Sequence, residues 1–71
     1  MRTARTAFQI VRDARKNITA RNDDKEYISP EEAHLLAEEG ATDFSTSQQS
    51  DGSSRIDFEF QGVRFVTVRR L

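Results

Sequence analysis

His34 is the only histidine in the chain, and it lies between two glutamates at helical spacing. Glu31, His34 and Glu38 are three and four positions apart, which brings their side chains onto one face of a helix. A metal site of this kind needs further ligands from another element, and the sequence has no second histidine and no cysteine. The simpler interpretation is an exposed histidine that pairs loosely with Glu38. We therefore expect no metal and no cofactor.

No group of residues is nominated as a catalytic site. As a general base, His34 would need a positioned nucleophile and an orienting group, and the sequence offers neither. The serines between residues 45 and 54 are explained by the composition of a loop. The three glycines are isolated from one another, so they form no phosphate-binding loop. The chain is therefore expected not to be an enzyme.

Acidic side chains gather in the middle of the chain. Residues 22–54 carry nine carboxylates against one lysine. Glu31 and Glu32 lie at the start of a predicted helix, where negative charge is favourable, but Glu38 and Glu39 lie at its unfavourable end. Such charges would be attracted to a basic groove on another protein, including one that normally holds nucleic-acid phosphates. We predict an acidic partner-binding surface made of Asp23, Asp24, Glu26, Glu31, Glu38, Glu39 and Asp43.

Basic side chains at the two ends of the chain define an alternative. Residues 1–21 carry six arginines and lysines against one aspartate, and residues 55–71 carry four arginines against two acids. Guanidinium groups donate paired hydrogen bonds to phosphate. Against this, the net charge of -1 is far from that of a dedicated nucleic-acid module, and no motif of stacking aromatics is present. The alternative is direct nucleic-acid contact through Arg5, Arg12, Arg15, Lys16, Arg64, Arg69 and Arg70.

The N-terminal segment has the apolar spacing of an amphipathic helix. Its apolar side chains recur at intervals of three and four, and Thr3 or Thr6 is suited to cap it. Asn17 suits a left-handed position, so the helix is expected to end near residue 16 or 17. A strand through Phe8 and Ile10 is the competing interpretation for residues 7–14, and we prefer the helix. The predicted apolar stripe is Ala4, Ala7, Phe8, Val11, Ala14 and Ile18.

The clearest local pattern in the chain is Ser29-Pro30-Glu31-Glu32. A serine before a proline and two glutamates is typical of a helix N-terminus. Ile28 can pack on Ala33 as a hydrophobic staple, and Gly40 supplies a left-handed stop. The pattern predicts a helix over residues 30–39, after a short extended segment or loose hairpin over residues 18–28.

The C-terminal part of the chain predicts a β-hairpin. Apolar and charged residues alternate over residues 56–60, and Gln61-Gly62 fits a two-residue turn. This register pairs Phe60 with Val63 and Phe58 with Phe65 on one face, and Glu59 with Arg64 on the other. The second strand is apolar on both faces, so we expect it to be central in a sheet of three strands. Residues 45–54, which lack apolar side chains, are expected to form a flexible polar loop.

These elements predict one small α+β domain spanning residues 1–71, with two helices packed on the hairpin. The chain lacks cysteine, the apolar stretch of a signal peptide and any span long enough for a bilayer, so we expect a cytoplasmic protein without membrane contact. Since a sheet edge can pair with a second copy, a monomer and a homodimer both remain open. The predicted core is Phe8, Val11, Ile18, Ile28, Leu36, Phe44, Ile56, Phe58, Phe60, Val63 and Phe65.

The general character of the chain resembles the small accessory proteins of phages and mobile elements, among them the anti-CRISPR proteins. The shared features are a very short cysteine-free domain, blocks of charge, one capped helix and a terminal hairpin. The resemblance concerns the whole chain and not aligned residues, so it assigns no site residues. It implies stoichiometric inhibition, in which a compact protein docks on a large host nucleoprotein complex and blocks target binding or recruitment of a nuclease.

Overall fold

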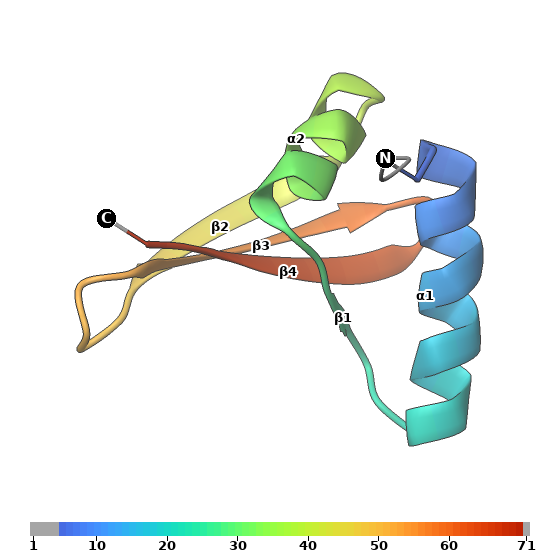
Figure 1. Ribbon diagram of the computed structural model, residues 1–71, viewed down its shortest axis with the longest axis horizontal. Helices are drawn as coiled ribbons and strands as arrows, with labels where there is room; N and C mark the ends of the chain where they lie inside the picture. The colour runs from blue at the N-terminus through green and yellow to red at the C-terminus, as the bar shows by residue number, and fades with distance from the viewer. Residues whose placement is uncertain (1–4, 71) are drawn as a thin grey trace, which may run out of the picture.

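The computed structural model describes residues 5–70, which form two helices and a mixed sheet of four strands (Figure 1). In chain order the elements are α1 (Ala7–Arg21), β1 (Glu26–Tyr27), α2 (Pro30–Glu38), β2 (Thr42–Gln48), β3 (Ser54–Phe60) and β4 (Val63–Arg69). The strand order is β1-β4-β3-β2, with β1 parallel to β4 and the other pairs antiparallel. The α+β class is therefore confirmed, with one strand more than the three predicted. Residues 1–4 and 71, including Thr3 and Ala4, lie outside the described range.

The hairpin of β3 and β4 has the register that the sequence predicts. Phe60 pairs with Val63, Phe58 with Phe65, and Glu59 with Arg64. The turn residues Gln61 and Gly62 have φ angles of 52° and 76°, the left-handed values of the turn that matches the twist of two antiparallel strands. β4 lies between β1 and β3, so its predicted central place is also confirmed.

β2 occupies part of the segment that was expected to be a flexible loop. Residues 45–48 pair with β3, and only residues 49–53 form the connection between the two strands. Asp51 closes this connection by accepting hydrogen bonds from the backbone and hydroxyl of Ser53, at 3.0 and 2.6 Å. The prediction of a loop over 45–54 is therefore wrong for its first and last residues. Backbone pairing with β3 holds this strand, and such pairing needs no apolar side chain.

α1 begins where expected and ends later. Thr6 accepts from the Gln9 amide at 3.2 Å, and the Gln9 side chain accepts from the Thr6 amide at 2.9 Å. The helix continues through Asn17 to Arg21 and ends at Asn22, whose φ of 53° is left-handed. The predicted end near residue 17 is wrong, because the Asn17 side chain instead donates a hydrogen bond to Glu26 at 2.8 Å.

The buried face of α1 is rotated from the predicted stripe. Ile10, Val11 and Ala14 are buried against α2 and the sheet, whereas Phe8 is 73% exposed. The preference for a helix over residues 7–14 is confirmed. The inclusion of Phe8 in the predicted core is wrong. Ile10 takes the place in the core that was predicted for Phe8, because it is on the side of the helix that faces the sheet.

α2 has the predicted start, and it ends at Glu38 with Glu39 as its C-cap. The Ser29 hydroxyl accepts from the Glu32 amide at 3.2 Å, and Pro30 occupies the first turn. Ile28 and Ala33 are both buried in the same hydrophobic core, as the predicted staple requires. Gly40 follows with a φ of 113°, a conformation that favours glycine.

One hydrophobic core lies between the helices and one face of the sheet. Phe58, Phe65 and Leu36 are completely buried there. Phe44, which was predicted to be part of this core, is 52% exposed on β2, so that assignment is wrong. Seven of the predicted core residues are buried and two more pack partly against them, namely Val11, Ile28, Leu36, Phe58, Phe60, Val63 and Phe65, and then Ile18 and Ile56.

Candidate protein-binding surface

α2 and the first residues of β2 carry a group of exposed carboxylates, which we call the acidic α2 surface and define as Glu31, Glu38, Glu39 and Asp43. Glu38 contacts His34 at 3.7 Å, with both side chains largely exposed. No ion pair engages Glu31, Glu39 or Asp43 among residues 5–70. Four of the seven predicted acidic residues are therefore exposed on α2 and at the start of β2.

The other three predicted acidic residues do not join this surface. Glu26 is only 6% exposed and forms an ion pair with Arg21, so its assignment to a partner-binding surface is wrong. Asp23 and Asp24 are exposed beside Lys25 in the connection that follows α1, away from α2 (Figure 1). Burying a carboxylate requires compensating partners, and the end of α1 supplies them to Glu26.

Arg5 joins the start of α1 to the start of α2. Its Nε and Nη2 atoms donate to the two carboxylate oxygens of Glu32 at 2.7 and 2.9 Å, and its Nη1 donates to Asp13 at 3.0 Å. These bonds from Arg5 hold the pKa of Glu32 and the pKa of Asp13 below their usual values. Because its guanidinium is already engaged by two carboxylates, Arg5 is not a free contact for nucleic acid.

We predict that Arg5→Ala destabilises the protein at neutral pH by about 1–2 kcal/mol. This is the usual contribution of a pair of charge-assisted hydrogen bonds, lowered because the groups are partly exposed. A carboxylate with a lowered pKa stabilises the folded state above its unfolded pKa, and this contribution is lost as pH falls through the folded pKa. Urea unfolding of the wild-type protein and the Arg5→Ala variant should therefore give a difference in the free energy of unfolding that is largest near pH 7. This difference should disappear toward roughly pH 2, below the carboxylate pKa range. A difference that does not change with pH would contradict this role for Arg5.

The remaining predicted basic residues form two separate groups. Arg15 donates to the Gln61 carbonyl at 3.0 Å, which places the outer side of α1 beside the turn that leads to Arg64. Arg69 is the last residue of β4 and Arg70 follows it, at an end of the strand that is roughly 20 Å from Arg64 at the usual rise of a strand. Arg64 already pairs with Glu59 at 3.3 Å, and Arg12 with Asp13 at 3.5 Å. The predicted basic surface is therefore not one continuous patch.

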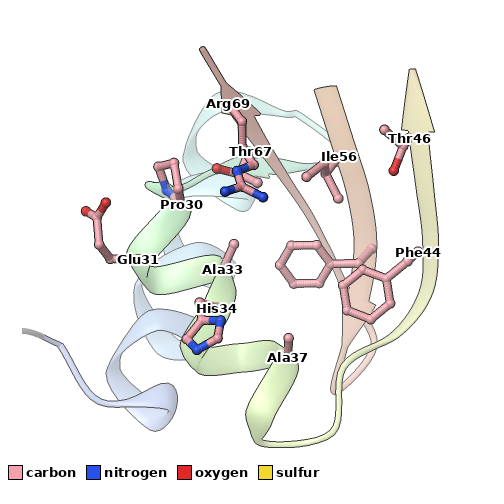
Figure 2. A pocket seen from close by; sticks show the side chains of 11 residues that line it. Pro30, Glu31, Ala33, His34, Ala37, Phe44, Thr46, Ile56, Thr67 and Arg69 are labelled. Carbon is pink, nitrogen blue, oxygen red and sulfur yellow. The ribbon is translucent and has the colours of Figure 1, made fainter. Parts of the chain in front are cut away.

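A groove of about 590 Å³ lies between α2 and the outer half of the sheet. Figure 2 shows Ala33 and Ala37 facing Phe44 across it, while the Glu31 carboxylate points outward. The two alanines are too small to reach β2, and this leaves the space open. The residues that line the groove are Pro30, Glu31, Ala33, His34, Ala37, Phe44, Thr46, Ile56, Phe58, Thr67 and Arg69.

A row of stacked phenylalanines crosses the sheet beside this groove. The Phe44 ring lies 5.2 Å from that of Phe58, and Phe58 lies 5.7 Å from Phe65, with interplanar angles of 24° and 21°. Phe65 and Phe58 are completely buried, whereas Phe44 ends the row at the edge of the sheet. Sequence reasoning missed this site because Phe44 was counted as a core residue. A single large aromatic in an otherwise polar stretch was the signal that could have revealed it.

Within residues 5–70, no three His, Cys, Asp or Glu side chains come together as a metal ion would require. Neither helix of this described range is long and apolar enough to cross a membrane. No protein-family model, curated protein or solved structure matches the chain. Its class is therefore defined by its own fold, a small α+β domain with an exposed acidic helix and an adjoining apolar groove.

Proposed function

We propose that this protein is a non-catalytic binding protein that inhibits or regulates a host protein or nucleoprotein complex by docking on it. The acidic α2 surface carries this proposal. Three of its four carboxylates have no ion-pair partner among the described residues, and Glu38 and Glu39 lie at the helix end where negative charge is unfavourable. Charges of this kind, which do not serve the fold, are suited to steer a basic partner into contact.

The apolar groove beside the acidic α2 surface supports the same function. Protein interfaces commonly combine an apolar centre with a polar rim. Here the half-exposed Phe44 ring and the groove form an apolar centre, with Glu31 and His34 at its border. The general resemblance to anti-CRISPR proteins suggests one form of this activity, in which the partner is a nucleoprotein complex whose target binding is blocked.

A pair of charge reversals tests the proposal. We expect the double variant Glu38→Lys and Glu39→Lys to lose its partner in an affinity capture from host lysate, because two attractive charges become repulsive. The fold should be retained, since lysine is favourable at a helix C-terminus. The matched control is Asp23→Lys with Asp24→Lys, which changes the net charge equally and should still recover the partner. Recovery by both variants would sink the acidic-surface proposal.

Direct binding of nucleic acid is the second candidate function. The observation in its favour is that Arg12, Arg15 and Lys16 are exposed on α1, with Arg15 bonded to the turn after β3. Binding driven by phosphate contacts weakens steeply as salt rises. A titration of labelled duplex and single-stranded DNA at several salt concentrations separates the two candidates, and absence of binding at low salt removes this one.

A further inference from the structure

β2 is an exposed edge strand with a bulge at its start, between Thr42 and Ser45, and regular pairing over residues 45–48. All seven of its residues are exposed, and it contains no proline and no lysine. Natural sheets commonly protect such edges with lysine, proline or a covering element, because unpaired backbone groups attract another strand. The opposite edge of this sheet is β1, which is only two residues long. The fold therefore offers one long edge for pairing.

The hairpin between β2 and β3 shows which backbone groups of β2 are free. The Gln49 amide donates to the Ser53 carbonyl at 2.8 Å, which makes these two residues a hydrogen-bonded pair. Hydrogen-bonded and non-bonded pairs alternate along an antiparallel ladder. Ser45 and Ser47 then direct their backbone groups toward β3. The amide and carbonyl groups of Thr46 and Gln48 point away from the sheet, toward an incoming strand.

The side chains beside this free edge define what an incoming strand should carry. The row of stacked rings stops at Phe44, so a strand paired with β2 would place an apolar side chain against its open side. The groove behind Phe44 can receive that side chain. Thr67 lines the same groove, and its hydroxyl is buried with no hydrogen-bond partner in the described part of the chain. Buried hydroxyls are normally bonded, so the groove suits a ligand that also brings a polar group.

The charges around the groove decide between a second copy and a different partner. The acidic α2 surface carries four carboxylates, and Arg69 is the one arginine or lysine among the residues that line the groove. A second copy would bring another acidic α2 surface to the assembly and would supply no lysine or arginine from its own β2. A segment flanked by lysine or arginine complements these charges.

We propose that β2 and the adjoining groove bind an extended, basic segment of a partner protein, which adds to the sheet as a fifth strand. Apolar residues at alternate positions of this segment would cover Phe44 and enter the groove, and its basic residues would face the acidic α2 surface. Strand addition gives affinity through backbone hydrogen bonds and specificity through alternate side chains. This inference rests on the proposed protein-binding function and states the mode of recognition.

The test begins with a display library of random ten-residue peptides selected against the intact protein. Peptides with alternating apolar residues and flanking lysine or arginine are the expected result. Hydrogen exchange is then measured by NMR, with and without the most enriched peptide. The amides of Thr46 and Gln48 should exchange rapidly in the free protein and become protected on binding, whereas those of Ser45 and Ser47 are protected throughout. Failure to enrich any peptide, or binding without protection of Thr46 and Gln48, overturns strand addition.

Matched variants separate the free edge from the groove. Thr46→Pro removes the outward amide without breaking a bond to β3, and it should weaken peptide binding by about tenfold or more, whereas Thr46→Ala keeps the amide and should bind normally. Phe44→Ala should also weaken binding.

Protection of the Thr46 amide that depends on protein concentration in the absence of peptide would assign the edge to a second copy and overturn the proposal. If host capture is lost in the Glu38 and Glu39 variant but retained by Thr46→Pro, docking through the acidic surface stands and strand addition fails.

Discussion

Phe58→Ala is expected to lower the free energy of unfolding by about 3–5 kcal/mol, the usual cost of truncating a buried phenylalanine. Phe58 is completely buried at the centre of the aromatic row, with Phe44 on one side and Phe65 on the other. The total stability of a 71-residue domain is roughly 4–10 kcal/mol. The variant should therefore keep at most about 7 kcal/mol of this stability, and urea titration followed by circular dichroism will show the lower unfolding midpoint.

Phe44→Ala is the matched control, because it removes the same side chain from the end of the same row. Phe44 is half exposed, so the loss should be about 0.5–1.5 kcal/mol, the contribution of a single aromatic pair. Similar losses in the two variants would mean that Phe44 belongs to the core. The proposal that Phe44 is free to receive a partner would then be wrong.

Ile10→Ala is expected to have the second large effect, a loss of about 2–5 kcal/mol in the free energy of unfolding. Ile10 is completely buried between α1 and the rest of the core. Phe8→Ala on the same helix is the control, and it should change stability by no more than about 0.5 kcal/mol, because Phe8 is largely exposed. Thermal and urea unfolding of the two variants will show which side of α1 faces the sheet. A larger loss for Phe8→Ala would contradict the packing described above.

The candidate site was predictable only in part. Glu31, Glu38, Glu39 and Asp43 lie close together in the sequence, so the chain alone indicated that they would share a surface. The environment of Glu26 was not predictable, because its partners Asn17 and Arg21 come from a different element. The groove was missed for the same reason. It exists because the small side chains of α2 meet an exposed strand that the sequence pattern did not indicate.

Local chemistry determined the elements that the sequence predicted correctly. Ser29 and Pro30 start a helix through bonds and geometry within one turn, and Gln61-Gly62 sets the register of β3 and β4 through its own backbone angles. Tertiary packing decided the rest. α1 has apolar side chains on two neighbouring faces, one containing Phe8 and one containing Ile10. Contact with the sheet selected the face that contains Ile10. β2 forms because β3 presents unpaired backbone groups to it, and such pairing leaves no periodic pattern of apolar side chains for a sequence to show.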